Sequence, residues 1–434
     1  MVDETQTQAG LAPAERSSRT DPPCPETGRG EAGRARPNLA PETGPRRDDH
    51  RPRDAHRGRD DRGRDEARPR AEGGGSPRPH GGPHGGPHSP HHSSHHRPGE
   101  GPRGRFSDSC YAALDLGTNN CRLLIARPTA SGFRVVDAFS RIVRLGEGLI
   151  GSGRLSEAAM SRAVDALAVC ASKINARRIA GARLIATEAC RSAANGAEFI
   201  ARVARETGLE LEIVDRETEA RLAAAGCTPL VDTHADGAVL FDIGGGSTEV
   251  VWLDRLETCD GGPPAAIIRA WVSVPLGVVT VAERHGGVKV TPADFEAMVQ
   301  EFRPHLDGFV AAVGPHNCGR LHLLGTSGTV TTIAGVHLDL PRYDRSQVDG
   351  TWLGAEQVRV VVDRLLAMPF AERAANPCIG VERADLVLAG CAILEAVRRA
   401  FPCDRLRVAD RGLREGILVE LMRADGVWRD SPGA

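Results

Sequence analysis

Two stretches of the sequence follow one pattern: "LDLGTNNCRLL" at residues 114–124 and "FDIGGGSTEVV" at residues 241–251. Each runs through an apolar residue, an Asp, a second apolar residue, a Gly, three small polar or Gly residues and an apolar-rich segment with one charge. Asp115 and Asp242 occupy the same place in the two copies, and a Gly follows each of them two residues later. The repetition of a whole segment indicates an internal duplication.

The residues around both stretches repeat a longer order of predicted elements. Short apolar runs and alternating patterns predict three strands in each copy, and helices and further strands follow them. Ser156 stands where a helix N-cap is expected. We therefore predict an α/β protein with two similar lobes that face one another. The main predicted strands are 111–116, 121–127, 132–143, 182–187, 209–215, 237–243, 248–253, 265–274, 320–325 and 405–410, and the main predicted helices are 156–174, 192–208, 216–226, 276–284, 292–313, 326–336 and 412–424.

Residues 1–107 differ in composition from the rest of the chain. Arg, Asp, Gly, Pro and His dominate them, and nine of the fifteen histidines lie there, seven between His80 and His96. Such a segment cannot bury enough apolar surface to offset the entropy lost on ordering, so we predict a disordered tail. The His-rich run either binds a divalent metal or is solvated low-complexity sequence, and the lack of a fixed ligand spacing favours the second. The rest divides into predicted lobes at 108–233 and 234–425 and a short C-terminal tail at 426–434.

Charge, hydropathy and cysteine usage restrict the class of function. The 55 Lys and Arg residues nearly balance the 57 Asp and Glu residues, which argues against a broad basic surface for nucleic acid. No apolar stretch approaches 18 residues and no targeting signal is recognisable, which argues against a membrane partner. The eleven cysteines include no Cys-x-x-Cys pair, so we expect a reducing, cytoplasmic compartment. Whether the chain forms a homodimer is left open. The cysteines expected to pack as small hydrophobic residues are Cys110, Cys121, Cys190 and Cys391.

The two predicted hairpins have the composition of phosphate-binding turns. Glycines leave backbone N–H groups unscreened, so Gly117 and the run at 244–246 can each hold a phosphate oxygen. An Asp at the end of the strand before each turn, as at Asp115 and Asp242, can hold a hydrated divalent cation. Two such turns facing across a cleft would hold a phosphate chain and its metal from both sides. Small hydrogen-bonding residues flank the glycines at Thr118, Asn119, Asn120, Ser247 and Thr248.

Each hairpin taken alone has an ordinary explanation, since many Gly turns only connect strands. Two such turns at matching places in a duplicated fold favour the phosphate-binding interpretation. A third small-residue turn, "GTSGT" at 325–329, precedes a predicted helix and could hold a phosphate or a nucleotide. The chain has no Gly-x4-Gly-Lys-Ser/Thr motif, which argues against a P-loop protein.

Taken together, the motifs resemble the exopolyphosphatase and guanosine pentaphosphate phosphohydrolase (Ppx/GppA) family. The resemblance covers residues 109–423, where "ALDLGTNNCRLLIA", "ATEACRSAANG", "ETEARLAAAG", "FDIGGGSTEVV", "GTSGTV" and "LRVADRGLREGIL" occur in the family's order. It implies membership of the superfamily of actin, sugar kinases and heat-shock chaperone ATPases. It also implies two ribonuclease-H-like lobes, an active site in the cleft between them, and Mg²⁺ as the usual cofactor, although other divalent metals would suit the same ligands.

The resemblance further implies roles for individual residues. Glu219 stands where the family has its general base, at the start of a predicted helix whose N-terminus would keep the carboxylate ionised. Asp242 and Glu249 match metal-associated positions, and Asp115, which begins the first phosphate loop, is a further candidate metal ligand. The residues matched to phosphate-binding positions are Gly117, Thr118, Asn119, Asn120, Arg122, Arg191, Asn195, Gly244, Gly245, Gly246, Ser247 and Thr248.

Some of these roles have ordinary alternatives. Glu219 could merely complement the dipole at a helix start. Arg191 could be a solvated arginine between a strand and a helix, although its guanidinium suits paired phosphate oxygens. The family often has two adjacent acids at the base motif, whereas Thr218 stands in place of the first of them here. The chain resembles the family's short form, without an additional metal-binding domain. The residues expected to have only structural roles are Asp385, Asp410 and Arg414.

The sequence therefore predicts a Mg²⁺-dependent phosphoanhydride hydrolase that removes the terminal phosphate of polyphosphate, with guanosine pentaphosphate (pppGpp) as the alternative substrate. These two substrates demand the same chemistry, so the residues do not separate them. A non-hydrolytic, nucleotide-gated binding protein is a second class, and the acid retained at Glu219 argues against it. A kinase is disfavoured because no sugar-binding or acetate-binding signature accompanies the loops.

Overall fold

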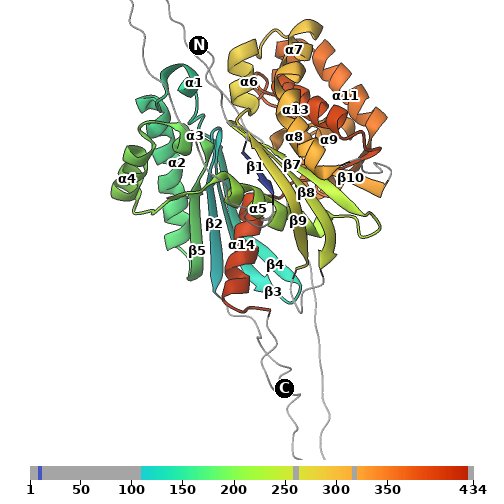
Figure 1. Ribbon diagram of the computed structural model, residues 1–434. Coiled ribbons are helices and arrows are strands. Elements are labelled where there is room, and N and C mark those ends of the chain that lie inside the picture. Colours follow the sequence, from blue (N-terminus) through green and yellow to red (C-terminus); the bar gives the residue numbers. More distant parts are fainter. Residues whose placement is uncertain (1–7, 12–108, 258–262, 315–319, 429–434) are drawn as a thin grey trace, which may run out of the picture. The chain divides into compact units, whose positions relative to one another are not determined.

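The computed structural model describes residues 8–11, 109–257, 263–314 and 320–428 (Figure 1). The predicted disordered tail lies outside these residues, apart from Gln8–Leu11, which form strand β1. β1 pairs antiparallel with strand β9, Ala265–Val274. Among the residues described, no helix combines the length and the apolar character that crossing a bilayer requires.

Five strands of the first half form one mixed sheet in the order β4-β3-β2-β5-β6. Two consecutive hairpins make β2, β3 and β4 antiparallel neighbours, whereas β5 lies parallel to β2 and β6 parallel to β5. Asp115 lies opposite Arg122 near the turn of the first hairpin. The strands are β2 Cys110–Leu116, β3 Asn120–Thr129, β4 Gly132–Ile142, β5 Ile179–Ala186 and β6 Glu212–Ile213.

The second half forms a mixed sheet in the order β1-β9-β8-β7-β10-β12-β11. Its hairpins repeat those of the first half: β7, β8 and β9 are antiparallel neighbours, and β10 lies parallel to β7. Asp242 lies opposite Glu249 at the position equivalent to that of Asp115 and Arg122. The remaining strands are β7 Gly237–Ile243, β8 Thr248–Glu257, β10 Leu321–Thr326, β11 Trp352–Gly354 and β12 Arg405–Ala409.

Helices surround both sheets. The Ser156 side chain accepts a hydrogen bond from the backbone N–H of Ala159, which confirms the predicted cap of α2. The helices are α1 Leu149–Ser152, α2 Glu157–Asn175, α3 Glu188–Ser192, α4 Gly196–Thr207, α5 Arg216–Cys227, α6 Val278–His285, α7 Pro292–Phe302, α8 Asp307–Val313, α9 Gly328–His337, α10 Arg345–Val348, α11 Ala355–Ala367, α12 Phe370–Ala375, α13 Val387–Ala400 and α14 Leu413–Ala424, with 3₁₀ helices at Thr228–Leu230 and Arg303–Leu306.

The predicted α/β class with two lobes is confirmed, and three predicted elements differ from the structure. The helix predicted over 192–208 begins only at Gly196, as α4, because the backbone of Ala193 is extended, and Ser192 instead ends the separate short helix α3. The strand predicted over 209–215 is reduced to the two residues of β6. The helix predicted over 292–313 is interrupted by a 3₁₀ turn that contains Pro304, whose ring and missing N–H disfavour a continuous helix.

Alternation along the strands of the first sheet sends side chains into two cores. Leu114 and Leu116 of β2 pack with side chains of α2 and α4, whereas Ala113 packs with side chains of α14. Because successive side chains point to opposite faces, Asp115 shares the face of Ala113. By the same count Arg122 shares the α14-facing side of β3. The acid and the arginine therefore point away from the α2–α4 core.

The second sheet repeats this division. Phe241 packs with side chains of α7 and α13, whereas Leu240 packs with side chains of α5. Asp242 shares the face of Leu240, and Glu249 shares the face of Val251, which packs in the same core as α5. The polar residues of both hairpins thus lie on the faces that α5 and α14 cover. The four cysteines expected to pack as hydrophobic residues are buried and free.

Helices α5 and α14 each pack on the sheet formed by the other half of the chain (Figure 1). α5 contributes to the core of the second sheet, and α14 contributes to the core of the first. The two helices meet at glycines: a Cβ on Gly226 would lie 2.0 Å from the carbonyl oxygen of Gly412, and one on Gly416 would lie 2.0 Å from that of Leu222. The lobe boundary at residues 233/234 stays a prediction, and both helices pack across it.

Candidate active site

Both predicted phosphate turns line one cavity. In each turn the first Gly donates its N–H to a carbonyl oxygen three residues later, from Gly117 to Asn120 and from Gly244 to Ser247, each at 2.9 Å. The turns also touch, since a Cβ on Gly246 would lie 2.8 Å from Oγ1 of Thr118. Glycine is needed there because the opposite turn fills the space of a side chain. The predicted residues that line the cavity are Asp115, Gly117, Thr118, Asn119, Asn120, Arg122, Glu219, Asp242, Gly244, Gly245, Gly246, Ser247 and Glu249.

The two turns present polar groups that have no partner in the described part of the chain. The backbone N–H groups of Gly245 and Gly246 donate to no other described residue. The side-chain oxygens of Asn119 and Asn120 are buried without a hydrogen-bond partner. Buried polar groups are normally satisfied, and exchanging the oxygen and nitrogen of either amide would present a donor instead. These groups are suited to a polar ligand between the turns.

Five carboxylates line the same cavity, and burial raises the pKa of four of them. Loss of water, followed by repulsion from Glu249, raises the pKa of Glu219 well above its usual value. Burial with repulsion from Asp242 raises the pKa of Glu249 to about 7, and burial raises that of Asp242 to about 6. Burial also raises the pKa of Asp115. Like charges held together away from water favour a bound cation or a bound proton.

This finding corrects the expected electrostatics of Glu219. The side chain does lie in the first turn of α5, but it is only 6% exposed. The helix N-terminus was expected to keep it ionised, whereas desolvation outweighs that effect and shifts the pKa the other way.

Arg191 lies beside the cavity and pairs with acids rather than lining it. Its Nη1 and Nη2 each lie 3.1 Å from Oε2 of Glu219, and Nη1 donates to the carbonyl oxygen of Val214 at 2.6 Å. Nε donates to Oε2 of Glu188 at 3.1 Å. The prediction that Arg191 faces phosphate is therefore not supported by its position, and the guanidinium instead orients the Glu219 carboxylate.

Two further predicted phosphate-binding residues also do not line the cavity. The Asn195 side chain is buried and holds the backbone of Leu155, accepting from its N–H at 2.8 Å and donating to its carbonyl oxygen at 3.0 Å. Thr248 is buried and donates to the carbonyl oxygen of Leu276 at 2.7 Å. Their hydrogen-bonding capacity is used within the fold, which a sequence motif does not reveal.

Other residues also line the cavity, some of them in the "GTSGT" turn that the sequence offered as a third phosphate or nucleotide site. Glu188 is buried at the start of α3, and pairing with Arg191, Ser192 and Arg216 outweighs the effect of burial and lowers its pKa. Glu188 lies within the motif "ATEACRSAANG", and this position is the sequence feature that could have identified it as a site residue. The "GTSGT" turn contributes Ser327, which has a positive φ of 118°. Arg383, from the turn before α13, also lines the cavity, and it belongs to none of the motifs by which the sequence could have identified it.

A second cavity adjoins the first and shares Asp115, Arg122, Asp242 and Arg383 with it. Arg122, Arg383 and Arg414 line it, and none of the three side chains makes a hydrogen bond or a salt bridge with any described residue. A guanidinium that is partly removed from water without a bonded partner favours an anionic ligand.

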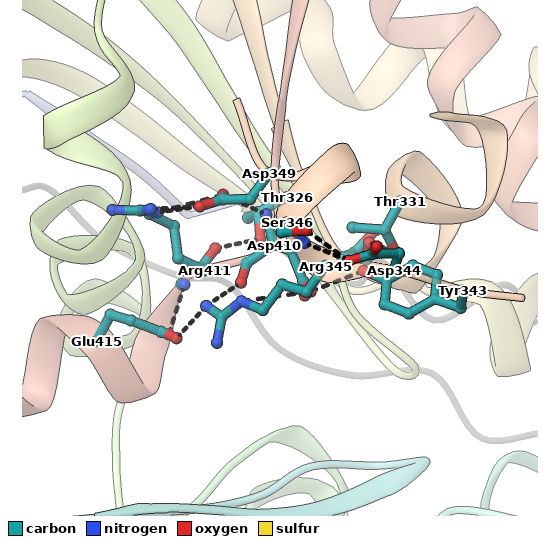
Figure 2. A network of polar contacts seen from close by, with 12 residues as sticks. Thr326, Thr331, Tyr343, Asp344, Arg345, Ser346, Asp349, Asp410, Arg411 and Glu415 are labelled. Atoms are coloured by element: carbon teal, nitrogen blue, oxygen red, sulfur yellow. Dashed lines mark hydrogen bonds and ion pairs between the residues drawn. The ribbon is translucent and has the colours of Figure 1, made fainter. Parts of the chain in front are cut away.

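Figure 2 shows the polar network that forms one wall of this second cavity. Arg345 lies 2.9 Å from Oε1 of Glu415 and 3.5 Å from Oδ2 of Asp410. The Tyr343 hydroxyl donates to the same Asp410 oxygen at 2.7 Å. Glu415 also accepts the backbone N–H of Gly412 at 2.9 Å. The network therefore fixes the turn before α14, which carries Arg414.

The acidic residues fit one type of metal site. Among the described residues, no three His, Cys, Asp or Glu side chains are arranged to hold a metal ion. Mg²⁺ commonly keeps several waters and is bound by one or two carboxylates together with substrate phosphates. Asp242 and Glu249 face each other across the β7–β8 hairpin, and burial is the main cause that raises the pKa of both carboxyls. This pair fits a hydrated Mg²⁺ whose coordination shell is completed by phosphate oxygens of the substrate.

The sequence and the fold are similar to those of several known proteins. A family model described as the Ppx/GppA phosphatase family matches residues 124–425. A putative exopolyphosphatase of Haemophilus influenzae is 28% identical over 326 residues, 74% of this chain and 94% of the relative. Exopolyphosphatase 2 of Mycobacterium tuberculosis is 29% identical over 325 residues, 71% of this chain and 98% of the relative. The crystal structure of the Ppx/GppA family member of Aquifex aeolicus is 29% identical with a TM-score of 0.60, covering 74% of this chain and 99% of that one.

Proposed function

Because the chain belongs to the Ppx/GppA phosphatase family, we propose that it hydrolyses the terminal phosphate of inorganic polyphosphate. The observation that carries this proposal is the meeting of two Gly turns and a buried glutamate, Glu219, at one cavity. The turns offer N–H donors to phosphate oxygens, and the glutamate offers a proton acceptor. The names of the two exopolyphosphatase relatives support the same class of substrate.

In the proposed reaction, Glu219 accepts a proton from a water molecule that attacks the terminal phosphorus in line with the P–O bond that breaks. Arg191 donates to Oε2 of Glu219, and no described residue bonds to Oε1, which leaves Oε1 to receive the water's proton. Burial, followed by repulsion from Glu249, raises the pKa of this carboxyl, and a higher pKa makes the carboxylate a stronger proton acceptor. The products are orthophosphate and a polyphosphate shorter by one phosphate.

The remaining groups would stabilise charge on the phosphate oxygens. The free N–H groups of Gly245 and Gly246 act as donors that are already in position before the reaction. A divalent cation held by Asp242 and Glu249 would neutralise negative charge on the transferred phosphate and so relieve its repulsion by the carboxylates.

The second cavity favours polyphosphate over pppGpp. A linear polyphosphate carries negative charge along its whole length, whereas in pppGpp a guanosine, which needs apolar or aromatic surface, separates the 5′-triphosphate from the 3′-diphosphate. Arg122, Arg383 and Arg414 supply three guanidiniums next to the phosphate turns, none of them engaged in a hydrogen bond or salt bridge with a described residue. They would hold the phosphates that follow the terminal one.

Substrate choice is tested by measuring phosphate release from long-chain polyphosphate, tripolyphosphate, pppGpp and ATP at equal phosphoanhydride concentration. Polyphosphate is expected to give the highest kcat/KM, because only an extended polyanion meets both cavities. A higher kcat/KM for pppGpp would transfer the assignment to nucleotide hydrolysis. No phosphate release from any substrate would contradict the hydrolytic assignment itself.

Removing either proposed metal ligand should reduce the response to Mg²⁺. In Asp242→Asn or Glu249→Gln, the Mg²⁺ concentration for half-maximal activity should rise by roughly tenfold, since second-shell losses alone typically cost about 10–100-fold in metal affinity or activity. Wild-type protein should also gain thermal stability with added Mg²⁺, because a ligand that binds only the folded state stabilises it.

The matched control is Asp363→Asn, which removes an acid from the exposed surface of α11. It should leave both the Mg²⁺ response of activity and the Mg²⁺-induced stabilisation unchanged. Full activity of the wild-type protein in excess chelator would contradict the metal assignment.

A further inference from the structure

A bidentate ion pair joins the two lobes at the edge of the cavity. Arg144 follows β4 of the first sheet, and Asp385 precedes α13 beside the second. Nη1 of Arg144 lies 2.8 Å from Oδ2 of Asp385, and Nη2 lies 2.9 Å from Oδ1. Nη2 also donates to the carbonyl oxygen of Glu382 at 3.0 Å. The two side chains are 32% and 28% exposed, so the pair has geometry and partial burial that surface ion pairs usually lack.

The backbone on the Arg144 side is bonded to the first phosphate turn. The N–H groups of Val143 and Arg144 donate to the carbonyl oxygen of Asn119 at 2.9 and 3.0 Å, and the N–H of Gly146 donates to that of Thr118 at 2.9 Å. A Cβ on Gly146 would lie 2.3 Å from Cγ2 of Thr118. Any movement of the segment 143–146 is therefore transmitted to the turn.

Arg144 also has an unfavourable backbone conformation. Its φ is 46°, one of three positive values at non-glycine residues in the described part of the chain. A non-glycine residue in this region costs free energy, and such a conformation persists where surrounding contacts hold it. The bonds to Asn119 and to Asp385 are those contacts.

The Asp385 side of the pair belongs to a turn that shapes both cavities. Arg383 lines both, and Leu386 lines the first. The backbone of Asp385 is packed against Gly287, where a Cβ would lie 1.8 Å from the Asp385 carbonyl oxygen. This turn therefore does not move independently of the second lobe.

We propose that Arg144 and Asp385 form a latch that holds the two lobes together over the reaction site and fixes the first phosphate turn in its binding geometry. They are positioning residues, because their side chains contact each other and not the cavity. Substrate enters and phosphate leaves when the pair separates. The kinetic consequence rests on the proposed function, whereas the coupling of the latch to the turn is a property of the protein alone.

The kinetic test uses Arg144→Lys, which keeps the charge but cannot form the bidentate pair. We expect KM for polyphosphate to rise by about three- to tenfold, the change that follows when an interaction that shifts an equilibrium constant by up to about tenfold is lost. The kcat should stay the same or increase, because the lobes separate more easily. Asp385→Asn should give the same split. The double variant Arg144→Asp with Asp385→Arg should restore KM. A lower kcat at unchanged KM, or no restoration in the double variant, would overturn the latch.

A second measurement needs no substrate. Hydrogen exchange of the amides of residues 143–146 should become faster by about tenfold or more in Arg144→Lys and in Asp385→Asn, since exchange reports the local opening equilibrium. The matched control is Arg399→Lys, which breaks the bidentate pair of Arg399 with Glu296 inside the second lobe. It should leave this exchange unchanged. Unchanged exchange in both latch variants would refute the coupling between the latch and the first phosphate turn, and faster exchange would support it. Either result holds whichever substrate the protein hydrolyses.

Discussion

Replacing Glu219 by Gln is expected to lower the turnover of polyphosphate hydrolysis by about 10²–10⁴-fold, the usual contribution of a general base. Gln keeps the size of the side chain and can still accept a hydrogen bond from Arg191, but it cannot take a proton from the attacking water. Substrate affinity should change little, because the phosphate turns are untouched. The measurement is phosphate release at saturating polyphosphate. Near-normal turnover in a folded Glu219→Gln protein would exclude the base assignment.

The stability of the same variant separates catalysis from folding. The folded-state pKa of Glu219 is raised, so ionisation of this group destabilises the folded protein: the penalty is absent below the unfolded-state pKa and grows as pH rises toward the folded-state pKa. Gln has no such penalty, and the unfolding temperature of the variant at and above neutral pH should equal or exceed that of the wild type. Glu217→Gln is the control, because Glu217 is exposed in the same turn of α5 and the change in charge is identical. It should retain turnover.

Replacing Gly416 by Ala is expected to destabilise the protein by about 1–3 kcal/mol or more, as for other insertions into a packed interior. The added Cβ would lie 2.0 Å from the carbonyl oxygen of Leu222, and the neighbouring atoms are backbone of α5, which cannot rotate away. The helices must separate, and because α5 carries Glu219, activity should fall together with the unfolding temperature. Thermal unfolding and phosphate release measure the two effects.

Gly308→Ala provides the matched control for this prediction. Gly308 is also helical, in α8, but it is exposed and a Cβ there would have no heavy atom within 4 Å. Since Ala favours helix over Gly by about 1 kcal/mol, this variant should be as stable as the wild type or more stable. An equally mild effect of Gly416→Ala would show that α5 and α14 are not in close contact.

The strand patterns were sufficient to predict the two hairpins and their Gly turns. Each hairpin is local, so the alternation of apolar residues and the Gly turn predicted its strands and its geometry. The position of Asp115 and Asp242 at the end of the strand before each turn was likewise apparent from the sequence. The same reasoning failed for 192–208, where nothing in the helical spacing announced the break at Ala193.

The motifs could not predict which polar side chains face the cavity and which form hydrogen bonds within the fold. Arg191 and Asn195 belong to one motif that also contains Glu188, and of these three residues Glu188 alone lines the cavity. Which of them faces the ligand depends on partners far along the chain, such as Leu155 for Asn195 and Glu219 for Arg191. The pairing of Asp385 could not be predicted for the same reason, because its partner Arg144 lies 241 residues away.

The packing of α5 and α14, each on the sheet of the other half, has a consequence for synthesis on the ribosome. The first sheet is complete once Ile213 has emerged, but the helix that covers one of its faces begins only at Leu413. At a translation rate of about 5–20 residues per second, that face, with Tyr111 and Leu124, stays uncovered for roughly 10–40 seconds. The nascent first half therefore presents an apolar surface of the kind that chaperones bind, and the native protein forms only after nearly the whole chain has been made.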